Sequence, residues 1–156
     1  MTKFLSAILI ITIISICSCS EKKSPVANNT KDRISLLEAD KSFSDLSAKS
    51  GMKAAFIEYI DSNGVLLRSD NVPIAGAMAI DYLIQFNDTG FNLIWQPHHA
   101  VVAKSGDLGY TYGIYSVTIP SSDTTIYGNY VHIWKKNLKG NWKFVLDSGN
   151  EGIGEQ

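Results

Sequence analysis

The chain has 156 residues, of which 45% are hydrophobic and 19% are charged, and its formal net charge is −1 at pH 7. This length and composition are typical of one globular domain. Because the basic residues are scattered and the net charge is close to zero, the sequence has no electrostatic signature of nucleic-acid binding.

Residues 1–18 are predicted to be a signal peptide. One lysine precedes an almost unbroken apolar run, FLSAILIITIISI, which is short for a transmembrane helix and suits a secretory signal. The following ICSC (16–19) resembles the lipobox of bacterial lipoproteins, with Ile16 and Ser18 before the cleavage site and Cys19 as the acylated residue. The resemblance implies a lipid anchor in the cell envelope. A plain secretory signal and an uncleaved anchor are the alternatives.

Residues 19–30 are predicted to be a flexible tether, because they are polar, include one proline and show no periodicity. Ser20, directly after the acylated cysteine, is compatible with the outer membrane of a Gram-negative cell. Once Cys17 leaves with the signal peptide, the folded domain contains no free thiol, so disulfides and cysteine–metal sites are excluded from it. The domain is expected over 31–152, followed by a tail at 153–156.

The first half of the domain is predicted to be mainly helical. A helix is expected over 32–48, with Asp32 as its N-cap, because apolar residues recur there at three- and four-residue steps. A second short helix is expected over 53–60, a short strand at 65–67, and a third helix over 76–86.

The second half is rich in aromatic and β-branched residues. Four strands are expected, over 92–104, 108–118, 125–136 and 142–147. Short turn signals separate them, so they are predicted to be antiparallel neighbours. Helices followed by a strand meander indicate an α+β fold.

The stretch SGDLGYTYG (105–113) has an unusual strand pattern. Alternation places Tyr110 and Tyr112 on one face of the strand, and Gly109 and Gly113 on the other. Because glycine weakens a strand interior, this nearly bare face predicts a bend in the sheet, the close approach of another element, or a cavity under the phenols.

Several motifs together carry a family resemblance: Ala39-Asp40 with Phe43, Ala55-Phe56, Pro73-Ile74 with Gly76, Trp95-Gln96-Pro97, the SGDLGYTYG stretch, Tyr130 with Trp134, and Trp142-Lys143 with Asp147 and Gly149. With the element order, they resemble the nuclear transport factor 2-like superfamily, which includes ketosteroid isomerase and SnoaL-like cyclases. The motifs are similar to those of a bacterial lipoprotein branch whose function is not established. The resemblance implies three helices packed in the hollow of a curved sheet, a conical cavity for a small-molecule ligand, and a homodimer through the outer sheet face.

The same resemblance speaks against steroid isomerisation. Phe43 stands where ketosteroid isomerase has a tyrosine donor, and Leu67-Arg68-Ser69 stands where it has its aspartate base. His132 replaces its aspartate oxyanion donor. Two of the three positions therefore lack the required chemistry.

Asp40 and His132 are the candidate catalytic residues. Asp40 lies inside the apolar stripe of the first helix, where a carboxylate needs a partner because burying it alone is costly. His132 could meet it across the cavity and transfer protons near neutral pH. The alternative is a structural network in which Asp40 hydrogen-bonds tyrosine or tryptophan groups.

The expected ligand-binding residues are aromatic: Phe43, Trp95, His99, Tyr110, Tyr112, Tyr130 and Trp134. His98 and His99 are adjacent in a strand and point to opposite faces, so only one is expected in the cavity. Alternation does not decide which, because Pro97 can mark a bulge. No metal and no cofactor are predicted, since two histidines are too few for a typical zinc site.

Three functions remain open from the sequence. The first is a lipid-anchored module that binds a small, partly apolar molecule without turnover. The second is a lyase, isomerase or cyclase of SnoaL type that uses Asp40 and His132. The third is a dimeric scaffold whose cavity is filled by its own side chains. Lys143 and Asp147 are interpreted as a solvated or cross-strand charge pair.

Overall fold

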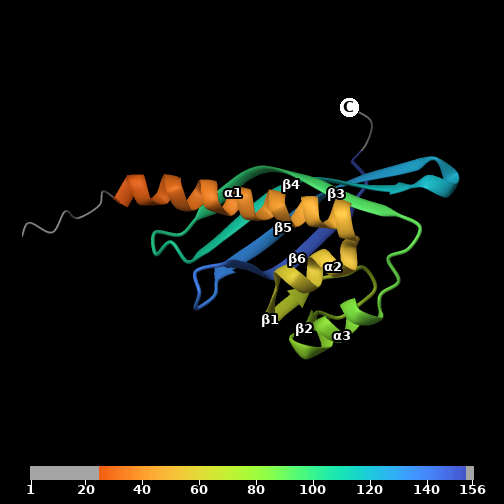
Figure 1. Cartoon of the computed structure of the whole chain (residues 1–156), viewed down its shortest axis with the longest axis horizontal. Helices are drawn as coiled ribbons and strands as arrows, with labels where there is room; N and C mark the ends of the chain where they lie inside the picture. The colour runs from red at the N-terminus through yellow and green to blue at the C-terminus, as the bar shows by residue number, and fades with distance from the viewer. Residues whose placement is uncertain (1–24, 154–156) are drawn as a thin grey trace, which may run out of the picture.

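Figure 1 shows a computed structural model of the protein, which describes residues 25–153. Its elements follow the order α1 (Pro25–Ser50), α2 (Met52–Tyr59), β1 (Ile60–Leu66), β2 (Ile74–Ala75), α3 (Ala77–Gln85), β3 (Asn92–Val102), β4 (Leu108–Ile119), a 3-10 turn (Pro120–Ser122), β5 (Thr124–Lys136) and β6 (Trp142–Glu151). The predicted acylation site, Cys19, and the predicted signal peptide lie outside the described residues. Among the described residues, no helix is both long and apolar enough to cross a membrane.

The strands form one six-stranded sheet in the order β2-β1-β6-β5-β4-β3. The four long strands pair antiparallel, as the short turns predict, whereas β1 pairs parallel with β6. All three helices lie on one side of the sheet, and α1 runs along it against β3 (Figure 1). The predicted α+β class, with three helices packed against a curved mixed sheet, is confirmed.

The first helix begins earlier than its sequence pattern predicts. It starts at Pro25, inside the expected tether, and proline is well tolerated in a first helical turn. Asp32 therefore lies within the helix and is not its cap. Its carboxylate instead forms an ion pair with Lys136, with 2.7 Å between Oδ1 and Nζ.

The glycines of the SGDLGYTYG stretch allow close approach of other backbone. A Cβ at Gly113 would lie 2.1 Å from the carbonyl oxygen of Gln96, and one at Gly109 would lie 2.6 Å from that of Val101. The same Gly109 position would be 2.8 Å from Leu36 Cδ2 in α1. The face of β4 that carries the glycines is therefore the one directed toward the helices. There the backbone of β3 and the Leu36 side chain of α1 lie close to the β4 backbone.

Two irregularities in pairing decide which side chains face the helices. In β3 the register shifts between Pro97 and His99. Proline within a strand often marks such a bulge. In the β5–β6 pair it shifts between Ile133 and Trp134. The second shift lets both Phe144 and Asp147 turn inward and become buried, although three positions separate them.

The outer edge of β3 is covered by side chains of α1. Ser44 Oγ accepts the Trp95 backbone N–H at 2.8 Å and donates to the Trp95 carbonyl oxygen at 2.7 Å. Ser47 Oγ donates to the Leu93 carbonyl oxygen at 2.7 Å. These serines therefore satisfy backbone groups that a further strand would otherwise pair with.

The core between α1 and the sheet is strongly aromatic. Phe43 is fully buried at its centre and packs edge-on to Trp95, with ring centroids 4.5 Å apart, and stacks on Phe144 at 5.4 Å. Such pairs add about 0.5–1.5 kcal/mol each beyond the area they bury. This cluster fixes the position of the polar side chains that lie beside it.

Candidate functional site

A cavity of about 400 Å³ lies between the sheet, α2 and the segment that follows α3, and it opens to solvent. Ligand pockets in proteins commonly have volumes of about 300–1,000 Å³. Its apolar walls come from three regions of the chain: Met52 and Phe56 in α2, Phe86 and Phe91 before β3, and Leu93, Trp95, Tyr115, Val117 and Ile119 in β3 and β4.

The polar lining residues are gathered on the other side of the cavity. Arg68 and Ser69 follow β1, and Asp147, Ser148 and Glu151 belong to the neighbouring strand β6. His132 lies between the two walls, on the central strand β5. The cavity therefore changes from polar to apolar along the strand order from β1 to β3.

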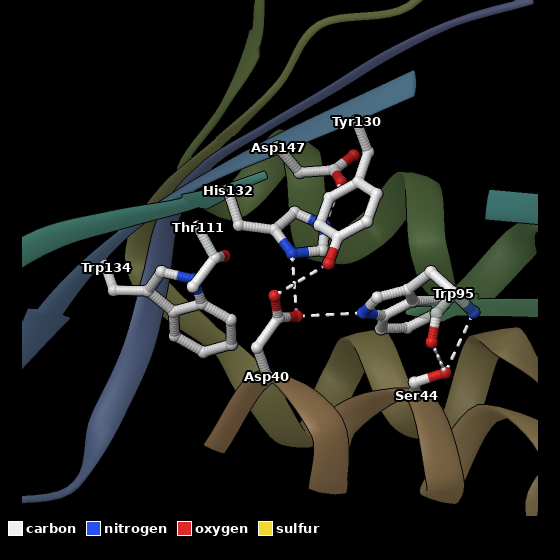
Figure 2. Close-up of polar contacts among 8 residues, drawn as sticks. All are labelled: Asp40, Ser44, Trp95, Thr111, Tyr130, His132, Trp134 and Asp147. Atoms are coloured by element: carbon white, nitrogen blue, oxygen red, sulfur yellow. Dashed lines mark hydrogen bonds and ion pairs between the residues drawn. The ribbon is translucent and has the colours of Figure 1, made fainter. Parts of the chain in front are cut away.

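Asp40 is the centre of a buried hydrogen-bond network (Figure 2). Its Oδ1 accepts Trp95 Nε1–H at 2.8 Å and lies 3.1 Å from His132 Nδ1, while its Oδ2 accepts the Tyr130 hydroxyl at 2.9 Å. The carboxylate is fully buried in α1, and its three partners come from β3 and β5.

The network continues from His132 to a second carboxylate. His132 Nε2 lies 2.9 Å from Asp147 Oδ1, and Arg68 Nη1 lies 2.5 Å from Asp147 Oδ2. Two carboxylates and two basic groups therefore alternate from Asp40 through His132 and Asp147 to Arg68. Arg68 also donates from Nη1 to the Leu67 carbonyl oxygen at 2.9 Å, and its guanidinium carbon lies 5.9 Å from the centroid of the Phe56 ring.

The electrostatics favour the charged form of all three buried members of the network. Burial opposes a positive charge on His132, but hydrogen bonds to Asp147 and Asp40 outweigh it and raise the pKa of His132 to about 9. Burial likewise opposes a negative charge on Asp40, yet the hydrogen bond and positive charge of His132 keep its pKa below the usual value. The pKa of Asp147 is lowered for the same reason, with a further contribution from Arg68.

This charge state limits what His132 can do. Both ring nitrogens face carboxylates, so the imidazolium has no free nitrogen with which to accept a proton. Asp40 is not a lining residue of the cavity, and its oxygens already accept three donors. The arrangement is that of a structural network whose polar groups bond one another. Two of its members, His132 and Tyr130, line the cavity.

The predicted ligand-binding residues fall into three groups. Trp95 and Tyr130 line the cavity. Phe43 and Trp134 are fully buried in the core, where Trp134 Nε1 donates to Thr111 Oγ1 at 2.8 Å. These two side chains are not among the cavity-lining residues.

Tyr110, Tyr112 and His99 lie on the outer face of the sheet, so their expected place in the cavity is wrong. The two phenols are 42% and 46% exposed, because Gly109, Thr111 and Gly113, and not the tyrosines, lie on the face of β4 toward the helices. His99 pairs with Tyr112, and their ring centroids are 6.1 Å apart. His98 is also exposed, so neither of the two adjacent histidines lines the cavity.

Arg68 and Asp147 are the polar site residues that the sequence pattern did not reveal. The expectation of a solvated Lys143–Asp147 pair is wrong, because the pairing shift in β6 turns Asp147 inward. Lys143 instead contacts the Glu58 carbonyl oxygen and side chain. The sequence signal that pointed to this site was Arg68, which directly follows the short strand predicted at 65–67.

No family model and no curated protein matches the chain. Solved structures do match it, among them a nuclear transport factor 2-like protein with a cystatin-like fold from Novosphingobium aromaticivorans, with a TM-score of 0.63, 20% identity and coverage of 81% of this chain and 85% of that one. A ketosteroid isomerase-like protein from Erwinia carotovora atroseptica has a TM-score of 0.54 at 14% identity and covers 85% of this chain and 99% of its own. A type 2 hexachlorocyclohexane dehydrochlorinase, LinA, has a TM-score of 0.58 at 12% identity, with 82% and 90% covered.

These similarities establish the fold. The chain has the nuclear transport factor 2-like, ketosteroid isomerase-like fold, in which a curved sheet and three helices enclose an aromatic cluster. At such low identity the likeness extends to the fold and not to a reaction, because this fold supports many unrelated activities.

Proposed function

We propose that the protein is a lipid-anchored cell-envelope domain that binds a small, partly apolar molecule in its cavity. The cavity of about 400 Å³ is the observation that carries this proposal. It is large enough for a ligand and combines aromatic walls with a few polar groups, as ligand sites usually do. A scaffold filled by its own side chains would leave no such space.

The arrangement of the walls supports an amphipathic ligand. The apolar part of the ligand would pack against Phe91, Leu93 and Val117, and its polar group would lie beside Arg68 and Ser69. Arg68 is held in place by Asp147 through Nη1, so the other donors of its guanidinium can reach a ligand.

Filling the cavity tests the binding function. In Val117→Trp the indole would occupy the apolar side of the cavity, and binding of the neutral fluorescent probe N-phenyl-1-naphthylamine should weaken at least about tenfold, which is about 1.4 kcal/mol. Leu138→Trp adds the same group to an exposed turn and should leave binding unchanged. Equal affinities in the two variants, or no probe binding by the unmodified protein, would contradict the proposal.

A SnoaL-like lyase, isomerase or cyclase is the second candidate. It is favoured by the position of His132 and Tyr130, which line the cavity and both contact Asp40. With a pKa of about 9, His132 would serve as a proton donor and not as a base. Mass spectrometry of molecules that copurify with the protein and with His132→Gln separates the candidates. Different molecules, related as product and substrate, would favour turnover, and the same molecule in both would favour binding.

A homodimer through the outer face of the sheet is part of the proposal. The outward positions of β3, β4 and β5 are uncharged between the strand ends, and their exposed apolar members are Ile94, Val101, Tyr110, Tyr112 and Tyr127. An antiparallel sheet that faces water usually carries polar side chains there. A charge-free aromatic face therefore supports burial against a second copy.

The anchor is proposed from the signal sequence and its lipobox-like ICSC motif. An acyl chain on Cys19, together with a second chain on the same residue, would suffice for stable membrane attachment. Mass spectrometry of the N-terminal peptide of the mature protein tests this directly, since unmodified Cys19 would exclude the anchor.

A further inference from the structure

The charges of the domain are separated along its long axis. One end, called here the basic end, is formed by the first turns of α1, the β3–β4 turn and the β5–β6 turn. With the side chains that line the hollow beside the β5–β6 turn, it carries seven basic and four acidic residues, a formal charge of +3: Lys31, Arg33, Lys104, Lys135, Lys136, Lys139, Lys143, Asp32, Glu38, Glu58 and Asp107. The rest of the described chain carries four basic and nine acidic residues, a formal charge of −5.

Contacts between the three segments show that the basic end is one surface. Lys136 bridges to Asp32 in α1, and its backbone N–H donates to the Asp107 carbonyl oxygen at 2.8 Å. Gly106 also approaches Asp32, since a Cβ there would lie 2.9 Å from the carboxylate. Figure 1 shows the start of α1 and both turns at the same end of the molecule, with the β4–β5 connection at the opposite end.

The basic residues of this end are mostly free to meet a partner. Lys31, Arg33, Lys104, Lys135 and Lys139 are exposed. Leu138 projects fully from the tip of the β5–β6 turn among them. Cationic side chains around a projecting aliphatic one match the surface of an anionic lipid bilayer, which offers phosphate groups above hydrocarbon.

The chain path brings this end to the membrane first. Cys19 precedes Pro25 by six residues, which span at most about 20 Å when fully extended. From Pro25 to Lys31 the helix rises only about 9 Å. The opposite end of the sheet lies a further strand of 12 residues away, about 40 Å.

We propose that the basic end docks on anionic phospholipid head groups of the bilayer that holds the N-terminal lipid. The long axis of the domain then points away from the membrane. The rest of the domain, whose net charge is negative, lies farther from the anionic surface. The orientation rests on the lipid anchor of the proposed function, whereas the attraction rests on charge alone. Electrostatic contacts of this kind act within about one Debye length, about 8–10 Å at physiological salt.

The acylated protein bound to vesicles provides the test. Because the mature protein has no free thiol, a cysteine introduced as Leu138→Cys or Ser121→Cys can carry a single fluorophore at the basic end or at the opposite end. The vesicles consist of phosphatidylcholine with or without phosphatidylglycerol, and both contain a lipid with a nitroxide on its head group. Quenching of the bound protein reports which end lies at the bilayer.

The proposal predicts that, with phosphatidylglycerol at low salt, the fluorophore at 138 is quenched at least about threefold more than the one at 121, and that this ratio falls in phosphatidylcholine alone and at high salt. The triple variant K104Q/K135Q/K139Q should lower the ratio to its value in phosphatidylcholine. The control K41Q/K49Q/K53Q removes the same charge elsewhere and should leave the ratio unchanged. Equal quenching at both positions, a ratio that is the same with and without phosphatidylglycerol, or displacement of the basic end by a DNA duplex would overturn the proposal. Unmodified Cys19 in the same sample would instead refute the anchor, which separates the two failures.

Discussion

At the scale of single residues, the charged groups of the buried network balance one another. Asp40 and Asp147 hold His132 between them, and Arg68 completes the neutral balance. Buried ion pairs are only weakly stabilising compared with apolar packing, but the removal of one partner is costly because it leaves an uncompensated charge. The network is therefore expected to matter most when it is broken.

Asp40→Asn should lower the free energy of unfolding by about 3 kcal/mol, because it removes one of the two negative charges that hold the His132 imidazolium. Urea unfolding followed by tryptophan fluorescence measures the change. The matched control Asp45→Asn breaks an exposed pair with Lys41 and should cost no more than about 0.5 kcal/mol. Similar losses in the two variants would show that the buried network contributes little.

Stability should fall as the pH rises from about 6.5 to about 9. The pKa of His132 is raised from its unfolded value of 6.5 to about 9, so its contribution is complete below the first value and lost on passing the second. The lowered pKa values of Asp40 and Asp147 add a separate loss in acid, below their unfolded value of 3.8. Urea midpoints across this range, with an NMR titration of the His132 ring, test the assignment. A ring that titrates near 6.5 would contradict it.

Part of this network could be predicted from the sequence. The apolar helical stripe around Asp40 indicates that its carboxylate is buried, and the family resemblance implies that it meets His132. Asp147 could not be placed in the same way, because a shift in strand pairing moves it to the other face. No local signal in the sequence fixes such a shift.

At the scale of secondary structure, the elements follow the sequence pattern closely in order and type. The main differences are the earlier start of α1 and the strand β1, which begins at Ile60 where the end of a helix was expected. The faces of β4 were harder to predict. Tyrosines are usual in cavities, but here the glycines beside them set the orientation by admitting the neighbouring backbone.

The two close glycines of β4 should not tolerate a side chain. Gly113→Ala should lower stability by about 1–3 kcal/mol, because its Cβ would lie 2.1 Å from the Gln96 carbonyl oxygen and force the strands apart. Gly149→Ala is the control, since its nearest neighbour, a ring carbon of Tyr115, is 3.3 Å away and can move. Urea unfolding compares the variants, and a neutral Gly113→Ala would refute the close approach.

At the scale of the whole molecule, the cone-shaped fold and its hollow follow from the order of elements and the family resemblance. The composition of the cavity wall does not, because five of the seven expected ring-bearing residues lie in the core or on the outer face. The residues that make one wall polar come from strand ends, where alternation no longer fixes direction.

If the outer face of the sheet forms a homodimer, a charge at its centre should disrupt it. Tyr112→Lys places a like charge on both copies and should convert the dimer to a monomer in light scattering coupled to size exclusion. A stable interface needs about 800 Å² from each copy. Val72→Lys, on an exposed loop, should leave the mass unchanged. A monomer before any substitution would refute the dimer.

The serines that cover β3 have a consequence for how copies of the protein can meet. Ser44 and Ser47 occupy the backbone groups of Trp95 and Leu93, and the next outward position is Pro97, which has no N–H to offer. An incoming strand would therefore find few free backbone partners over positions 93–97 of this edge, which hinders extension of the sheet there. Aggregation of the protein through pairing of this part of β3 is therefore disfavoured.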